Sequence, residues 1–428
     1  MTSTRLISGH VLSFKHSPFD QHPETSADIH ECVAVKDGYI VKLGSKKKLH
    51  SLFPDAQVSH YSNHLILAGF VDPHVHYPQT AIIASWGKRL IDWLTTYTFP
   101  EEIKFQDYEY ASLIAKRYLN LSLTVGTTTV CTYCTSHTES VDAFFFEAQK
   151  RNQRVVAGKT CMDRNAPEQL CDTAVAAYDD SKRLLDQWHG IGRLSYAITP
   201  RFAPTSTPEQ LDALGSLWRE YPHCLMQTHL CEQLDEIAWV QELFPNSRDY
   251  VDVYEHFGLL GKNGVYGHAI HLEERERVRL RDTNAAVIHC PTSNTFIGSG
   301  LFDLSTMIHE GQCVGLASDI GGGSSFSQLR TMASAYEIAQ LQGHPLHPAQ
   351  LLWLATIGSA TTLRMDDKIG NILPHYEADM IALNLASTPV IAQRSRHANS
   401  IWEALFPTIM LGDDRAITQV WIAGKPCL

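Results

Sequence analysis

The sequence predicts an α/β fold: a (β/α)8 TIM barrel with a small β-domain built from both chain termini. Eight apolar, strand-like runs lie between residues 65 and 322, and helical patterns separate most of them. Polar residues gather where these runs end. Strands that alternate with helices indicate βαβ units in a parallel sheet, and eight such units fit a barrel. In such a barrel the chemistry lies at the carboxyl ends of the strands.

The barrel is predicted to occupy residues 65–374. Its strands are expected at residues 65–76, 125–135, 154–163, 194–202, 224–232, 264–272, 285–294 and 313–322. The segments between them carry apolar residues at helical spacing, most clearly at residues 108–120, 172–188, 208–221 and 272–282.

The two ends of the chain have a different pattern. Residues 5–14 and 31–43 look like short strands, the second interrupted by a tight-turn signal at Asp37-Gly38. Residues 380–385 and 416–424 repeat this style near the carboxyl terminus. Isolated hairpins are only marginally stable in water. We therefore expect residues 1–64 and 375–428 to pair into one small β-domain.

Composition excludes several classes of partner. With 35 basic and 46 acidic side chains the formal net charge is −11, which argues against nucleic acid. The sequence holds no apolar run long enough to span a membrane, and its start lacks the apolar core of a secretory signal. The ten cysteines show no disulfide-framework spacing. These features predict a cytoplasmic protein that binds neither nucleic acid nor membrane.

The first predicted barrel strand ends in two histidines one residue apart, His74 and His76. Side chains alternate faces along a strand, so both imidazoles point the same way. Such a pair supplies two corners of a metal site, although two surface histidines would give the same pattern. Further candidate ligands end other strands: His229 on the fifth and Asp319 on the eighth. This convergence favours a catalytic metal centre held by His74, His76, His229 and Asp319.

A catalytic metal lowers the pKa of its water ligand toward neutrality, and other groups must then move protons. Glu232 starts the loop just after His229, where a carboxylate could carry a proton from the water to a ring nitrogen. The alternative is an acid that stabilises a helix N-terminus. His268 ends the sixth strand and would stabilise developing charge, unless it is only a core histidine. We therefore predict Glu232, His268 and Asp319 as catalytic residues.

These residues also carry a family resemblance. The segments 71–76, 228–232, 267–268 and 318–319 resemble the amidohydrolase superfamily, in particular its mononuclear metal-dependent deaminases. A more specific set is similar to members that act on guanine, namely residues 76–79, 97–101, 158–163, 199–202, 290–294 and 319–323. The likeness runs from about residue 5 to the carboxyl terminus. One departure is Ala68, where such enzymes often have proline.

The resemblance implies hydrolytic deamination of guanine to xanthine and ammonia by a zinc-dependent homodimer. The side-chain chemistry suits a small, flat purine substrate. Phe202 offers an aromatic face, Arg201 a fork of donors, and Gln79 an amide that donates and accepts. A structural ion pair for Arg201 and core packing for Phe202 are the alternatives. The predicted substrate-binding set is His76, Gln79, Arg201, Phe202, His229, Glu232 and Asp319.

The sequence is also compatible with other functions and with other metals. A related hydrolase could act on an s-triazine, another purine or a nucleoside, and a catalytically silent scaffold could share the barrel. Zinc, iron and manganese all accept this ligand set. Lys159 could be carbamylated to bridge two metals, as in other branches of the superfamily, but nothing in the sequence places a second ion. Cys131 and Cys134 lack a second pair and indicate strand packing.

Overall fold

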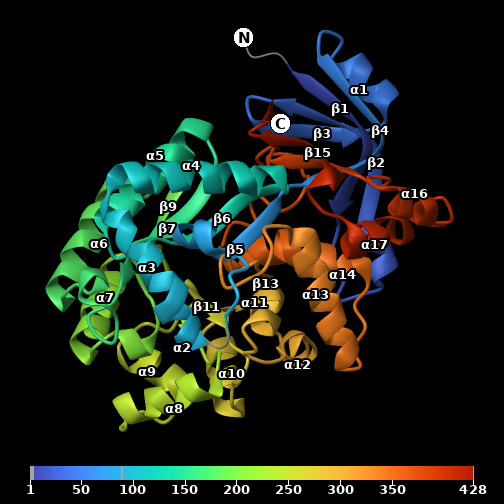
Figure 1. The fold of residues 1–428 in the computed structure, drawn as a ribbon. Helices are drawn as coiled ribbons and strands as arrows, with labels where there is room; N and C mark the ends of the chain where they lie inside the picture. Colours follow the sequence, from blue (N-terminus) through green and yellow to red (C-terminus); the bar gives the residue numbers. More distant parts are fainter. Residues whose placement is uncertain (1–3, 88–89, 428) are drawn as a thin grey trace. The chain divides into compact units, whose positions relative to one another are not determined.

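The computed structural model describes residues 4–87 and 90–427. The barrel sheet has the strand order β13-β12-β11-β10-β9-β7-β6-β5, and the short β8 pairs with β9 (Figure 1). Its strands are β5 (Phe70–His76), β6 (Thr127–Tyr133), β7 (Arg154–Gly158), β8 (Thr160–Cys161), β9 (Leu194–Pro200), β10 (Leu225–Leu230), β11 (Gly264–His268), β12 (Ala286–His289) and β13 (Cys313–Leu316). The predicted (β/α)8 barrel is confirmed, with strands at every predicted position.

The first and last strands meet through the backbone just beyond β13. The Asp319 amide donates to the His74 carbonyl oxygen at 3.1 Å, and the His76 amide donates to the carbonyl oxygen of Ile320. The chain after the eighth strand therefore continues the ladder along the carboxyl end of the first. This pairing brings the backbone of Asp319 beside that of the two histidines.

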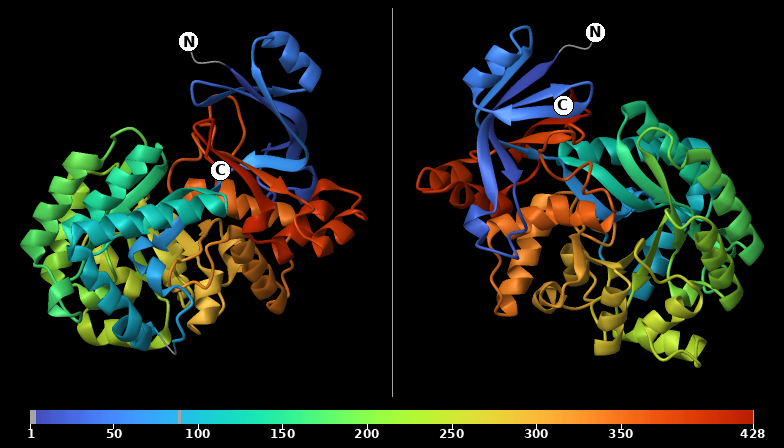
Figure 2. Two further views of the ribbon diagram at one scale, coloured as in Figure 1. Left: turned by 45° about the horizontal axis from the view of Figure 1, so that its top comes forward. Right: turned by 180° about the vertical axis from the view of Figure 1, so that it is seen from behind.

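Helices lie on the outside of the barrel strands (Figure 2). Among them, α5 (Thr138–Arg151), α6 (Ala174–Trp188) and α7 (Pro208–Glu220) pack against β7 and β9. Two of these helices begin at a capping threonine. The Thr173 hydroxyl accepts the Ala176 amide, and the Thr207 hydroxyl accepts the Gln210 amide. These caps explain why the predicted helices 172–188 and 208–221 start where they do.

The remaining helices include several that periodicity did not predict. They are α1 (Lys46–Leu52), α2 (Leu90–Trp93), α3 (Phe99–Glu102), α4 (Tyr108–Thr124), α8 (Leu234–Leu243), α9 (Tyr250–His256), α10 (Glu274–Asp282), α11 (Pro291–Phe296), α12 (Leu304–His309), α13 (Gln328–Leu341), α14 (Pro348–Trp353), α15 (Ser359–Thr362), α16 (Pro389–Ser395) and α17 (Ile401–Leu411). No helix in the described part of the chain is long and apolar enough to cross a bilayer.

A second sheet is built from both ends of the chain, as predicted. Its order is β16-β15-β14-β4-β1-β2-β3. The strands are β1 (Arg5–Phe14), β2 (Ala27–Lys36), β3 (Tyr39–Gly44), β4 (Gln57–Ala68), β14 (Met380–Asn384), β15 (Ile417–Ile422) and β16 (Lys425–Pro426). Buried Ile7, Val33, Ile66 and Met380 contribute to one core on this sheet. Long-range pairing thus supplies the stability that neither terminal hairpin has alone.

The predicted run 65–76 contributes to both sheets. Its first part belongs to β4 and its second to β5, with Gly69 between them. A Cβ atom on Gly69 would overlap the Thr128 side chain, so glycine permits this close passage. By contact density the chain divides into two units: residues to 72, 120–129 and from 326 onward in one, and residues 73–119 and 130–325 in the other. The domain limits at residues 64 and 374 stay a prediction.

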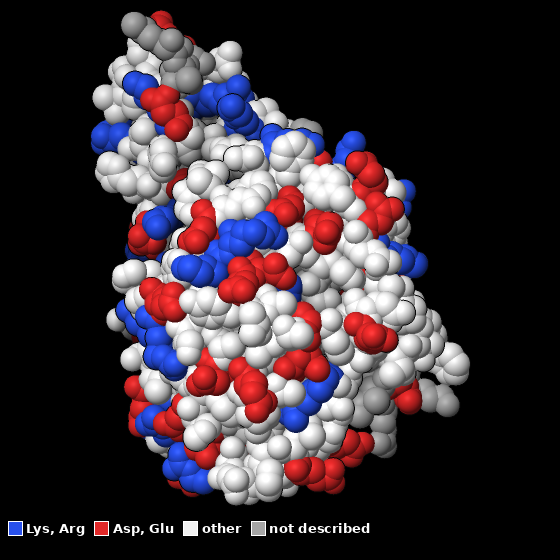
Figure 3. Space-filling model, turned by 90° about the vertical axis from the view of Figure 1, so that its left-hand side faces the viewer, with Lys and Arg blue, Asp and Glu red and all other residues white. Residues whose placement is uncertain are grey.

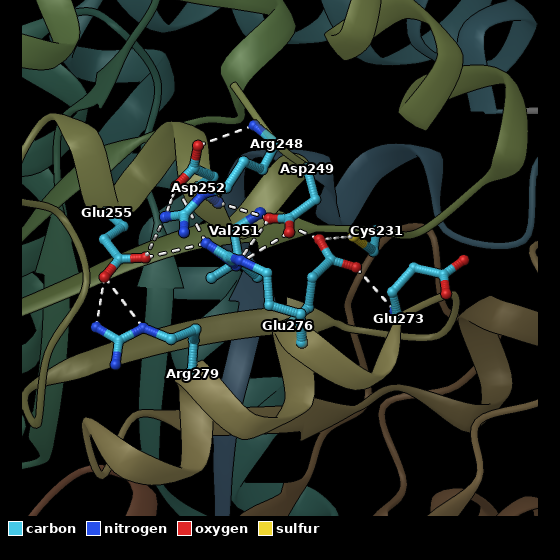
Figure 4. Close-up of polar contacts among 10 residues, drawn as sticks. Cys231, Arg248, Asp249, Val251, Asp252, Glu255, Glu273, Glu276 and Arg279 are labelled. Atoms are coloured by element: carbon cyan, nitrogen blue, oxygen red, sulfur yellow. Dashed lines mark hydrogen bonds and ion pairs between the residues drawn. The ribbon is translucent and has the colours of Figure 1, made fainter. Parts of the chain in front are cut away.

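Acidic and basic side chains intermingle on the face drawn in Figure 3. One charged cluster ties α9 to α10, and Figure 4 shows it in close-up. Asp252 accepts hydrogen bonds from Arg248 Nε at 2.9 Å and from Arg275 Nη2 at 3.0 Å. Glu255 pairs with Arg275 at 3.1 Å and also with Arg279. The arginines therefore bridge acidic groups that would otherwise repel one another.

Replacing Asp252 with asparagine should lower the free energy of unfolding by about 1 kcal/mol at pH 7, after allowance for solvent screening. Hydrogen bonds from Arg248 lower the pKa of Asp252 to about 2. A depressed folded-state pKa stabilises above the unfolded value near 3.9, and this stabilisation is lost as pH falls through the folded value. Urea denaturation should therefore show a smaller difference in the free energy of unfolding between wild type and Asp252→Asn at pH 3 than at pH 7. Asp282→Asn, at an exposed pair with Arg281, is the control and should change stability little.

Candidate active site

A pocket opens at the carboxyl ends of the barrel strands. All seven predicted substrate-binding residues line it, together with His268. Apolar side chains that sequence reasoning did not select complete the wall. The full lining is His76, Gln79, Leu90, Trp93, Leu94, Arg201, Phe202, His229, Glu232, His268, Ile297, Asp319 and Gly322. The side chains predicted from separate strands thus converge on one cavity.

The four predicted metal ligands lie together at the base of this site. The Nε2 atoms of His76 and His229 are 3.1 Å apart, and Asp319 Oδ1 lies 3.5 Å from Nε2 of both His74 and His76. Two overlapping groups have potential ligand atoms within 4.8 Å of one another: His74 with His229 and His268, and His74 with His76 and Asp319. The cluster could therefore hold a metal ion.

The donor chemistry of this cluster fits a cation. His74 Nε2 is buried and makes no hydrogen bond among the described residues, so it lacks the partner that a buried imidazole normally has. Burial, followed by the neighbouring imidazoles, lowers the pKa of His74, His76 and His229 well below the usual value. Neutral imidazole is the form that binds metal. His229 Nδ1 lies 2.7 Å from the Arg201 carbonyl oxygen, which directs Nε2 into the cluster.

Glu232 and His268 face each other beside this cluster. Glu232 Oε2 lies 3.6 Å from His268 Nε2, and Asp319 Oδ2 lies 3.8 Å from the same nitrogen. The other Glu232 oxygen accepts the Ser299 hydroxyl at 2.8 Å. His268 Nδ1 lies 2.9 Å from Asn294 Oδ1, which orients the ring. The site thus joins two carboxylates through one imidazole.

Raised pKa values distinguish His268 and Asp319 from His74, His76 and His229. Burial alone would lower the pKa of His268, but the charges of Glu232 and Asp319 raise it above the usual value. Burial raises the pKa of Asp319 to about 6. A carboxyl group whose pKa is moved toward neutrality, such as that of Asp319, is suited to proton transfer. His268 therefore differs electrostatically from the three imidazoles with lowered pKa values.

Gln79 and Arg201 are held by a residue that the sequence reasoning missed. Gln79 lies in a 3₁₀ turn that follows β5 directly, and Arg201 follows β9. The Glu102 carboxylate accepts Gln79 Nε2 at 3.0 Å and Arg201 Nη1 at 2.8 Å. Phe202 is 5% exposed and packs its ring 6.5 Å from that of His229. The structural ion pair considered for Arg201 therefore exists inside the pocket itself.

The backbone around the site is adapted to these side chains. A Cβ atom on Gly267 would overlap the His74 ring, so the glycine before His268 leaves room for the first ligand. Asp319 and His268 both adopt positive φ angles, of 51° and 67°. Such conformations are uncommon for residues other than glycine and cluster at functional sites.

Three polar residues at the site had no role assigned from the sequence: Glu102, Asn294 and Ser299. Asn294 closes the segment 290–294, which carried part of the family resemblance, so its motif was a usable signal. Glu102 follows Glu101 directly, and the sequence alone does not tell which of two adjacent acids faces inward. Ser299 lies in a loop without periodicity, and we find no sequence signal that would have selected it.

Lys159 does not line the pocket. Its ammonium group forms an ion pair with Asp172, and its side chain is 1% exposed. Burial favours the neutral amine, but Cys161 and Asp172 together raise the pKa of Lys159 above its usual value. Carbamylation requires the neutral amine, so this environment disfavours the metal-bridging role considered from sequence.

The fold and the site define the class: a (β/α)8-barrel protein with a metal-binding cluster at the carboxyl ends of its strands. The chain belongs to the Amidohydrolase family, whose model matches residues 65–427. It is 44% identical over 392 residues to the guanine deaminase of Escherichia coli, an alignment that covers 91% of this chain and 89% of that protein. A guanine deaminase of Dictyostelium discoideum is 33% identical over 85% of the chain and 82% of that protein.

Solved structures agree with these sequence relatives. An E. coli guanine deaminase structure superposes with a TM-score of 0.96 at 41% identity, covering 99% of both chains. A guanine deaminase structure from C. acetobutylicum with bound guanine in the active site gives a TM-score of 0.90 at 28% identity, covering 100% of both chains. The amidohydrolase resemblance expected from the sequence is confirmed.

Proposed function

We propose that this protein hydrolyses guanine to xanthine and ammonia at the pocket described above. The observation that supports this most directly is the arrangement of Gln79, Arg201 and Phe202 around the His/Asp cluster. Polar groups that fix the orientation of a ring, next to a cluster able to hold a metal, suit hydrolysis of a heterocycle. The similarity to guanine deaminases over most of the chain supports the same substrate.

Three side chains would contact the purine and fix its orientation. Phe202 presents an aromatic face against which a flat ring can lie. Arg201 uses one nitrogen on Glu102 and keeps further donors for the carbonyl oxygen of guanine. Gln79 supplies a second directed contact at the edge of the ring. Leu90, Trp93 and Leu94 add the apolar wall that a neutral base requires.

We propose His74, His76, His229 and Asp319 as the ligands of a zinc ion, one per subunit, although iron and manganese are compatible with this donor set. When bound, such an ion acts as a Lewis acid that makes water nucleophilic near pH 7. Glu232 takes a proton from the attacking water and delivers it to the ring nitrogen beside the amine-bearing carbon. Asp319 passes the second proton of that water to the amine as the carbon–nitrogen bond breaks and ammonia leaves, while His268 stabilises the developing charge.

The assembly and location are also proposals. We propose a homodimer, as the family resemblance implies, and light scattering of the purified protein would test this. We propose a cytoplasmic location because the ten cysteines lack the spacing of a disulfide framework and most of them are buried, as expected in a reducing compartment. The negative net charge supports a small-molecule substrate over nucleic acid.

The proposed substrate is tested by comparing the turnover of several heterocyclic compounds by the purified enzyme. Release of ammonia is measured with guanine, guanosine, adenine, cytosine and an s-triazine, and the product of guanine is identified as xanthine by its ultraviolet spectrum. We expect guanine to be turned over with the highest kcat/KM. Turnover of guanosine without turnover of guanine, or preference for the triazine, would contradict the proposed substrate.

A further inference from the structure

Glu102 connects the two polar residues that face the proposed substrate. It is the last residue of α3 and its side chain is 1% exposed. One carboxylate oxygen accepts Gln79 Nε2 at 3.0 Å, and the other accepts Arg201 Nη1 at 2.8 Å. Gln79 follows the first barrel strand and Arg201 follows β9. A single buried carboxylate therefore fixes two groups that come from separate elements.

The contact to Gln79 selects one orientation of its amide. An ionised carboxylate only accepts hydrogen bonds, so the amide must turn its nitrogen toward Glu102. The amide oxygen then lies on the other side, 3.4 Å from the Gly321 backbone nitrogen, which donates to it. Because both ends of the Gln79 amide are hydrogen-bonded, the donor and the acceptor that it presents to the pocket cannot exchange places.

The contact to Arg201 fixes its position and balances its charge. The guanidinium carbon lies 5.7 Å from the centre of the Phe99 ring, in the same short helix as Glu102. The Arg201 side chain is 4% exposed, and a buried cation without a partner would be costly. With Glu102 as counter-ion, the pair as a whole is neutral. Because Glu102 offsets the charge of Arg201 in the pocket wall, the pair gives an organic anion little advantage over an uncharged ring.

We propose that Glu102 is a positioning residue that sets the selectivity of the pocket for a neutral ring with the hydrogen-bonding edge of guanine. This inference rests on the proposed function and deepens it. Glu102 acts through Gln79 and Arg201. Its loss should therefore weaken the recognition of the base more than it slows the chemical step.

The neighbouring Glu101 provides a matched control. It is also a buried glutamate, 4% exposed, and it also pairs with a cation, Lys104. Its other oxygen accepts the Tyr110 hydroxyl. None of these partners lines the pocket. Glu101→Gln therefore makes the same chemical change one residue away without touching the recognition groups.

The experiment measures kcat and KM for guanine in wild type, Glu102→Gln, Glu102→Asp and Glu101→Gln, with thermal denaturation and metal content for each. In Glu102→Gln the new side chain has one acceptor end and one donor end. Gln79 can then rotate its amide oxygen toward the donor end, which exchanges the donor and the acceptor that Gln79 presents to the pocket. We expect KM to rise ~10- to 100-fold, the range for losing a hydrogen bond to a charged group, with kcat within about threefold. Glu102→Asp keeps an acceptor-only group and should recover part of this loss, and Glu101→Gln should keep the wild-type KM.

A double variant separates positioning from general destabilisation. If Glu102 acts through Gln79, then Glu102→Gln and Gln79→Ala combined should raise KM by less than the product of the single effects. An unchanged KM in Glu102→Gln, an equal rise in Glu101→Gln, or fully multiplicative effects would each overturn the inference while wild type still deaminates guanine. Wild type that does not deaminate guanine would overturn the proposed function, and this inference with it.

Discussion

Glu232→Gln should still bind guanine but lose ~10²- to 10⁴-fold in kcat, the usual contribution of a positioned general acid–base group. Glutamine keeps the shape of the side chain and can still pair with the Ser299 hydroxyl, which now lies 2.8 Å from Glu232 Oε1. It cannot carry a proton between water and the ring nitrogen. Because the lost interaction belongs to the transition state, KM should change little.

The measurement is steady-state turnover of guanine together with calorimetric titration of guanine into the nearly inactive variant. Glu242→Gln, at an exposed position on α8, is the matched control and should behave as wild type. Turnover within a few-fold of wild type in Glu232→Gln would show that another group moves the proton. Loss of guanine binding together with turnover would instead assign Glu232 a role in recognition.

The sequence predicted the barrel and the convergence of the candidate site residues because both depend on local periodicity, whereas the roles of these residues stay predictions. A strand has period two, so His74 and His76 had to share a face. Parallel strands of a barrel end on the same side, so His229 and Asp319 had to approach them. The structure brings these side chains into one cluster, as predicted. Gln79, Arg201 and Phe202 also reach the same pocket.

The missed features depend on long-range contacts. The apolar run 65–76 carries no sign that β4 joins one sheet and β5 the other, because every residue of the run is buried and its hydropathy does not change at the crossover. Glu101 and Glu102 differ only in which way their side chains leave a short helix, and α3 is too short to give a periodic pattern. Glu102 becomes recognisable only when Gln79 and Arg201 are seen to donate to it.

Asp319→Ala should lose both the metal and the activity. Asp319 is the only carboxylate among the four proposed ligands, so its loss removes the one negative charge that offsets a divalent cation directly. The three remaining imidazoles have lowered pKa values and stay neutral. Removal of one ligand from such a site weakens metal binding strongly, and the proton transfer to the leaving amine is lost as well.

Metal content per chain, measured by mass spectrometry after dialysis, separates these two effects. We expect wild type to retain about one ion per subunit, the open single-metal site that this ligand set favours, and Asp319→Ala to retain much less. Asp186→Ala, which removes an exposed carboxylate from α6, should keep the wild-type metal content. Full metal content in an inactive Asp319→Ala would contradict its assignment as a ligand and leave only its proton-transfer role. Full activity after complete removal of metal from wild type would refute the metal-dependent mechanism itself.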